Sequence, residues 1–491
     1  MNSATPLLAM AASLGGAALV GAAGRVPVLR DALAIGVAAL QLICILTMWP
    51  AIMDGGTISI VLADFVPSVP IALKVDALGM MFALTASGLW LLSSIYAVGW
   101  LRALNSHAQT RFHLCFALTM TATLGVAFAA NLLTLYLFYE AMTLATYFLV
   151  THEQTEEAYA GGRKYVAYHL GTSIAFLLPA IVLTYVQAGT LNFTAGGVFS
   201  AEMVDSSRTL LIVTYLLFLA GSAKAAMMPL HAWLPAAMVA PVPVSALLHA
   251  VAVVNAGAFG VLRVIFDVFG ITTLGELGMT TVTLYLSSFT IIAASLYALK
   301  LDSLKALLAY STIGQLSYIV LGAVIADPDG MAGGIVHIAN HGVAKITLFL
   351  CAGSIYLAGH LKYLHEMSGV GRQMPWTMAA FVVGALSMIG LPLTAGFISK
   401  WLLISGAWRA QDIGVIVVLA LSTLLSAAYY LRAIGMLGGL ARGRGAAPPA
   451  ALREVSPWIV VPLVATAALT LLLGLFAEQT LLPLARLVAA P

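Results

Sequence analysis

Long apolar segments separated by short polar ones run through the whole chain. A helix needs about 20 apolar residues to cross the hydrocarbon core of a membrane. On this criterion the pattern predicts an all-α polytopic membrane protein with about 14 transmembrane helices. The predicted spans are residues 5–24, 32–51, 77–101, 113–129, 131–151, 164–187, 208–232, 242–264, 278–299, 304–325, 331–359, 376–405, 412–435 and 457–481.

Ionisable residues recur at a regular spacing in the eleventh of these segments. The stretch "HIANHGVAK" places His337, His341 and Lys345 four residues apart, so all three face one side of a helix. An ionisable side chain at the centre of a membrane costs roughly 2.5–3.5 kcal/mol on insertion scales. Three such residues on one face therefore indicate a function rather than packing.

Two predicted spans, the seventh and the twelfth, contain helix breakers near their centres. The breakers are Pro229, Pro235, Gly390, Pro392 and Gly396. Proline frees backbone carbonyls, which are tolerated where a broken helix is buried in protein or lines a wet cavity. Each interrupted span also carries one lysine, Lys224 or Lys400. The alternative is that these prolines are ordinary, since proline is common in membrane helices.

The interrupted spans lie five spans apart, which predicts two inverted repeats of five helices. Interrupted segments in matching positions of two repeats are typical of an ion pathway. The predicted units are N-terminal helices 1–3 (residues 1–112), a first repeat of helices 4–8 (113–265), a second repeat of helices 9–13 (278–435), a cytoplasmic linker (436–456) and a C-terminal helix (457–491).

Other buried ionisable residues extend the pattern beyond the eleventh span. Glu140 is the only acidic residue in its span, and Lys224 is its natural partner. Buried pairs stabilise poorly, so this one suggests a switchable element, with a static ion pair as the alternative. His249 either relays protons or is structural, and Lys305 either joins the row or anchors the chain at the cytoplasm. The predicted row of proton-transfer groups is Glu140, Lys224, His249, His337, His341, Lys345 and Lys400, with Lys305 as a further candidate.

Composition narrows the class of protein. Of the 491 residues 62% are hydrophobic and 8% are charged, whereas soluble domains carry about 25% charged residues. The three cysteines form no C-x-x-C pair, so we expect no iron–sulfur cluster and no zinc or other metal in this chain. His337 and His341 share one helix face and lack a facing pair, which argues against a haem. We therefore expect no cofactor.

The basic residues predict how the chain is oriented. Lysine and arginine concentrate in one alternate set of the short loops. By the positive-inside rule these loops are cytoplasmic, which places both termini outside. We expect a multi-pass protein of a bacterial-type inner (cell) membrane.

Four motifs resemble one family of membrane proteins. They are "KAAMMPLHAWLPAAMVAPVPVSALLHA", "LLAYSTIGQLSYIVLG", "HIANHGVAKITLFLCAGSIY" and "GLPLTAGFISKWLL". Together they resemble the proton-translocating antiporter family shared by Mrp-type sodium/proton antiporters, complex I and membrane-bound hydrogenases. The resemblance implies fourteen helices, two inverted five-helix repeats and broken helices 7 and 12.

The resemblance also implies roles for individual residues. Glu140 and Lys224 match the family's essential glutamate–lysine pair, and Lys400 matches its terminal lysine. His249, His337, His341 and Lys345 match its connecting central axis. Asn255 departs from the pattern, because the family commonly has a lysine there; asparagine can hold water but carries no charge.

Three functions are compatible with these residues. The first, which resemblance to the D-type subunit of Mrp antiporters favours, is an ion-translocating subunit of a multisubunit cation/proton antiporter. The second is a proton-pumping membrane subunit of a redox complex, in which case the redox chemistry lies in partner subunits. The third is a structural subunit that has lost transport, for which Asn255 is the only support. The expected partners are other membrane subunits, lipid, protons and possible sodium ions, with no nucleic acid.

Overall fold

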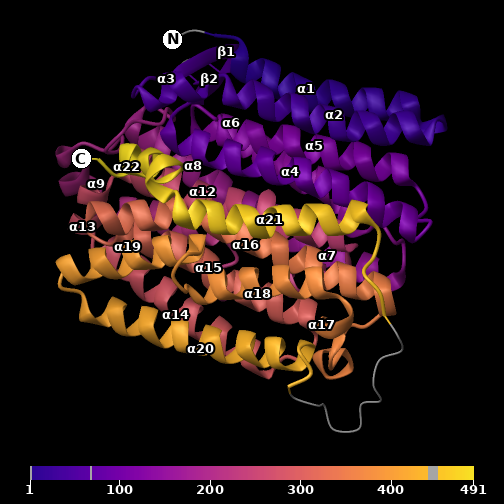
Figure 1. The fold of residues 1–491 in the computed structure, drawn as a ribbon. Coiled ribbons are helices and arrows are strands. Elements are labelled where there is room, and N and C mark those ends of the chain that lie inside the picture. The colour runs from indigo at the N-terminus through magenta and orange to yellow at the C-terminus, as the bar shows by residue number, and fades with distance from the viewer. Residues whose placement is uncertain (1–2, 67–68, 441–451, 491) are drawn as a thin grey trace.

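The computed structural model describes residues 3–66, 69–440 and 452–490. Long helices lie side by side and fill almost the whole molecule, with a small β-hairpin near the N-terminus (Figure 1). The predicted linker 436–456 lies partly outside the described residues.

The N-terminal helices form one edge of the bundle. The elements are α1 (Thr5–Ala22), α2 (Pro27–Leu46), α3 (Trp49–Met53), β1 (Ile58–Val66), β2 (Val69–Val75) and α4 (Ala77–Ala103). The strands pair antiparallel, with Ile58 opposite Val75. Helix α1 packs on α2 and α5, and α2 packs on α4.

The middle of the chain contains the first interruption. The elements are α5 (Gln109–Ala127), α6 (Leu132–Val150), α7 (Glu156–Thr172), α8 (Leu178–Ala188), α9 (Ala201–Gly221), α10 (Trp233–Ala236), α11 (Val242–Ala246), α12 (Val253–Arg263) and α13 (Ile271–Glu276). Short π-helical turns at Ser173–Leu177, Leu247–Val251 and Val264–Phe269 join several of these helices. Such turns occur often at functional sites.

The C-terminal part contains the second interruption. The elements are α14 (Met279–Lys300), α15 (Leu304–Val324), α16 (Pro328–Gly359), α17 (Val370–Gln373), α18 (Pro375–Ile389), α19 (Ala395–Arg409), α20 (Ile413–Leu437), α21 (Pro457–Leu475) and α22 (Leu482–Ala489). Helix α21 contacts α4, α16 and α18, and it runs across the front of the bundle in Figure 1.

Polar side chains begin many of these helices. At the start of α4, Asp76 accepts a hydrogen bond from the backbone of Gly79, and at the start of α6, Asn131 accepts one from Thr134. Such a cap satisfies one of the N–H groups that the first turn leaves without a helical partner. The caps therefore fix where the chain turns from loop to helix at the ends of the spans.

Within the described residues, 12 helices are long and apolar enough to cross a membrane. The predicted spans 113–129 and 376–405 are not among them. The first corresponds to α5, which carries Arg111, His113 and several threonines, and the second is divided into α18 and α19. The exact number of helices and the inverted repeats therefore remain predictions.

The helices that carry His249, Lys305 and the stripe on α16 lie in the interior. Each percentage is the share of residues in the helix's apolar 18-residue window that are buried inside the protein. It is 94% in α15, 89% in the segment Val242–Phe269 and 78% in α16. In α20 and α21 the value is 33%. Surrounding helices thus shield the ionisable residues from lipid, as polar groups in a membrane require.

Candidate functional site

The first interruption places Lys224 inside the protein. Helix α9 ends at Gly221, and Lys224 lies in the 3₁₀ turn Ala223–Ala225 that follows. The side chain is fully buried, its Nζ donates to the backbone oxygen of Tyr139 at 3.0 Å, and Nζ lies 3.3 Å from the centre of the Tyr139 ring.

A glycine allows the neighbouring helix to approach this turn. A side chain on Gly257 of α12 would overlap the backbone of Lys224 and Ala225. Trp233, beyond the interruption, donates its indole N–H to Ala223 at 2.8 Å. The two breakers Pro229 and Pro235 lie in and beside the irregular segment between α9 and α11. The broken backbone is thus held by protein contacts, as a membrane interior requires.

Glu140 lies beside this turn without forming an ion pair with it. No salt bridge joins Glu140 to Lys224 in the described part of the chain, although their charges are close enough to interact. Both carboxylate oxygens of Glu140 are buried and lack a hydrogen-bond partner among the described residues. Tyr139, the residue before Glu140, is the group that Lys224 contacts. The proposed pair is therefore adjacent but open in this conformation.

The second interruption binds Lys400. Helix α18 ends at Ile389, Gly390 adopts a φ of +93°, and Pro392 lies in the turn before α19. From α19, Lys400 reaches back and donates to the carbonyl oxygens of Met388 and Ile389, each at 2.9 Å. The last carbonyls of a helix lack partners within it and form the negative end of its dipole. The break therefore creates a binding site for one ammonium group, formed by two carbonyl oxygens.

A glycine also closes this interruption. A side chain at Gly396 would overlap the carbonyl oxygen of Ser387, and the Gly396 N–H donates to the Ser387 hydroxyl at 3.0 Å. Helices α18 and α19 are thereby held together around the turn.

The stripe on α16 is fully buried. His337 is bonded through Nδ1 to Ser399 Oγ at 2.7 Å and through Nε2 to Gln315 Oε1 at 3.0 Å. Ser399 immediately precedes Lys400, so this histidine lies beside the second interruption. The rings of His337 and His341 are 6.1 Å apart, and neither ring nitrogen of His341 has a partner within the described ranges.

Lys345 ends the stripe among neutral oxygens. Its Nζ donates to Ser311 Oγ at 2.9 Å and to Leu308 O and Tyr430 OH at 3.3 Å. Over the residues described, Lys224, Lys345 and Lys400 have no carboxylate within ion-pair distance. The three amines thus share a setting of carbonyl and hydroxyl oxygens.

His249 and Asn255 lie between the first interruption and the stripe. His249 occupies the π-helical turn Leu247–Val251, its ring is 4.8 Å from that of Phe349, and its nitrogens are unpartnered in the described structure. It lies close enough to Lys345 and His341 for their charges to interact. Asn255 donates to the Ala250 carbonyl at 2.8 Å, closing the turn that contains His249.

Lys305 joins the broken segment rather than extending into solution. Its Nζ donates to the carbonyls of Met238 and Ala240 at 2.7 and 2.8 Å. These carbonyls belong to the end of the interrupted region, just before α11. Lys305, on α15, therefore contacts the C-terminal end of the first interruption, whereas Lys224 lies at its N-terminal end.

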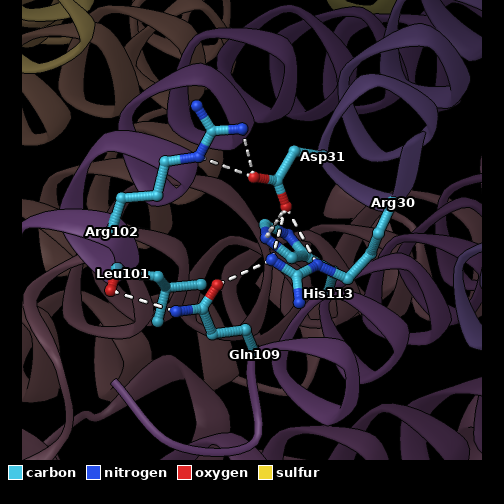
Figure 2. Close-up of polar contacts among 6 residues, drawn as sticks. All are labelled: Arg30, Asp31, Leu101, Arg102, Gln109 and His113. Carbon is cyan, nitrogen blue, oxygen red and sulfur yellow. Dashed lines mark hydrogen bonds and ion pairs between the residues drawn. The ribbon is translucent and has the colours of Figure 1, made fainter. Parts of the chain in front are cut away.

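Among the ionic clusters outside this row, two involve the N-terminal helices. Figure 2 shows that Arg30 and Arg102 converge on Asp31, with Nε distances of 2.9 and 2.8 Å, while His113 Nε2 is 3.8 Å from the same carboxylate. Gln109 accepts a further bond from Arg30 at 2.6 Å (Figure 2). In the sequence Arg30 and Arg102 are basic residues of the short loops, and nothing there signals that they share Asp31. The cluster joins α2, α4 and α5.

The second cluster joins the start of α4 to the end of α12. Arg263 of α12 is buried and donates to both oxygens of Asp76 at 2.7 Å and to Asp267 at 2.8 Å. Both partners are acidic and Arg263 keeps its charge, so the cluster can hold the helices together but cannot carry protons.

The fold and the site define a class: a polytopic membrane protein with interrupted helices and with amines and imidazoles buried in its interior. Residues 129–426 match the family model described as NADH:quinone oxidoreductase/Mrp antiporter, transmembrane. The chain belongs to this family.

Two sequence relatives illustrate the match. The chain is 32% identical over 425 residues to NADH-quinone oxidoreductase subunit N of Desulforudis audaxviator, covering 83% of each chain. It is 29% identical over 360 residues to NADH-quinone oxidoreductase subunit M of Rickettsia prowazekii, covering 73% of this chain and 71% of that one.

Two solved structures share the fold. A chain of the Mrp complex from Dietzia sp. superposes with a TM-score of 0.86 at 23% identity, covering 99% of this chain and 96% of that one. A chain of respiratory complex I from Thermus thermophilus superposes with a TM-score of 0.76 at 24% identity, covering 96% and 98%. The protein is thus an antiporter-like membrane subunit of the complex I and Mrp family.

Proposed function

We propose that this chain translocates protons along the row formed by Glu140, Lys224, His249, His337, His341, Lys345 and Lys400. The observation that carries the proposal is the setting of the three lysines, each held by neutral oxygens and by no carboxylate in the described residues. A buried charge without a counter-ion is costly. An ammonium group in such a setting can release its proton without leaving a buried carboxylate unpaired.

The contacts support a stepwise transfer between neighbours. Protons pass between groups within hydrogen-bond reach or through one water. His337 joins Ser399 beside Lys400, and the unpartnered nitrogens of His341 and His249 can bind a proton or a bridging water. Asn255 carries no charge, so in this proposal it supports the turn around His249 and water completes the link to Lys224.

Two assemblies would use such a subunit. The sequence motifs favour a cation/proton antiporter of the Mrp type, whereas the names of the relatives favour a quinone-reducing redox complex. Gentle extraction followed by mass spectrometry separates them. Co-purifying small hydrophobic subunits without cofactor proteins support the antiporter, and subunits that carry iron–sulfur clusters support the redox complex.

Proton flux into membrane vesicles that contain the assembled complex tests the proposal itself. We expect Glu140→Ala and Lys224→Ala to abolish flux, while the amount of assembled complex stays unchanged. His365→Gln, at an exposed position in the 3₁₀ turn Leu364–Met367, is the control and keeps the wild-type rate. Full flux in both alanine variants would contradict the proposed pathway.

A further inference from the structure

His169 is a buried imidazole that the row does not include. It lies on α7, and only 1% of its surface is exposed. Neither ring nitrogen has a hydrogen-bond partner in the described residues, which is costly for a polar group away from water. A histidine that served only to pack these helices would gain from having at least one of its nitrogens bonded.

The neighbours of His169 connect it to the first interruption. Its ring centre is 4.2 Å from that of Trp233 and 4.3 Å from that of Tyr165. Trp233 is bonded to Ala223, the residue before Lys224, and the Lys224 charge is close enough to interact with the imidazole. His169 therefore faces the turn that carries the lysine.

The other side of His169 leads to a pair of hydroxyl groups. Tyr165 is one helical turn earlier on α7, and its hydroxyl is 2.6 Å from Thr146 Oγ1 of α6. Tyr165 also lies within electrostatic range of Glu140. Tyr165 lies between His169 and the start of α7 at Glu156. Hydroxyl groups thus lie on the side of the imidazole opposite the π-helical turn Ser173–Leu177.

We propose that His169 exchanges protons with Lys224 and so connects the row to the side of the membrane at which α7 begins. The step rests on the proposed function above. A proton from water beside Tyr165 binds one ring nitrogen, and the other ring nitrogen gives its proton to the neutral Lys224 amine, directly or through one water. The water is left as hydroxide, which the solvent neutralises, and His169 returns to its neutral form.

The test is proton flux by the assembled complex carrying His169→Gln. Glutamine retains size and hydrogen bonding but cannot carry a proton. We expect the flux per assembled complex to fall on the order of tenfold or more, since proton-relay groups typically contribute 10²–10⁴-fold. The pH dependence of the remaining flux should also change. The ionisable groups that face His169 are Tyr165, whose ring centre is 4.3 Å away, and Lys224, whose charge acts on the imidazole.

The controls distinguish a failure of the His169 inference from a failure of the proposed proton translocation. The role of His169 alone would be overturned by one combination of results. In it, the wild type shows flux, Lys224→Ala abolishes the flux, and His169→Gln keeps both the wild-type rate and the wild-type pH profile. Absence of wild-type flux would overturn the proposed function instead. His169→Asn is the second variant; if neither variant assembles, His169 is structural and the inference fails.

Discussion

At the scale of single residues, two of the buried lysines bind backbone oxygens at the helix interruptions. Lys400 contacts the last carbonyls of α18, and Lys305 contacts those before α11. The sequence predicted that Lys224 and Lys400 would lie at interruptions, because proline, glycine and lysine occur together there. It could not predict the acceptors, since these are main-chain oxygens with no signature in the sequence.

Asp327, at the start of α16, provides a pH-dependent contribution to stability. Hydrogen bonds from Arg409 lower the pKa of this carboxyl below its usual value, and the bonds that it accepts from the backbone N–H groups of Asp329 and Gly330 act in the same direction. Because the folded pKa lies below the unfolded one, this stabilisation is complete above about pH 4 and is lost as the pH falls further.

We expect Asp327→Asn to lower the unfolding temperature of the purified complex at pH 7. The difference from wild type should shrink as the pH falls from about 4 toward the lower pKa of the folded state. Differential scanning fluorimetry at several pH values measures both effects. A difference that stays constant down to the acid limit would refute the role assigned to this carboxylate.

At the scale of elements, the interruptions were the most predictable feature and the polar neighbours of α7 the least. Pro229 and Gly390 indicated breaks that the structure contains. His169 was missed because a lone histidine in an apolar helix gives no signal until its neighbours are known. The Asp31 cluster was missed because Arg30 and Arg102 were assigned only to loops.

Gly396→Ala tests how tightly the second interruption is closed. The added methyl group would overlap the Ser387 carbonyl, so we expect a loss of about 1–3 kcal/mol, as for overpacked sites. Gly435→Ala is the control, because a side chain there meets nothing within 4 Å. Thermal unfolding of both variants measures the contrast, and equal stability of the two would mean that α18 and α19 are not held in this way.

At the scale of the whole molecule, outer helices enclose a polar interior, and ionic clusters tie the N-terminal helices to the bundle. Composition and apolar spacing were sufficient to predict a helical membrane protein. They were insufficient to count its helices, because α5 is only moderately apolar and α18 and α19 share one predicted span. The orientation of the termini stays a prediction that basic residues alone support.

Asp31→Asn tests the cluster that joins α2, α4 and α5. Removing the carboxylate leaves the buried charge of Arg30 without its counter-ion, which costs about 3–5 kcal/mol for a buried pair. We expect a lower unfolding temperature and less assembled complex, with the proton flux per complex unchanged. Loss of flux in fully assembled complex would instead place this cluster in the pathway.

The central claim is that protons cross the interior laterally, through the middle of the row. Lys345→Met tests it most directly, because both interruptions and their lysines remain intact while the link between them loses its titratable group. The measurement is proton flux in vesicles, expressed per assembled complex. The account predicts that flux is lost although the complex assembles normally. Flux at the wild-type rate would contradict a lateral pathway through α16.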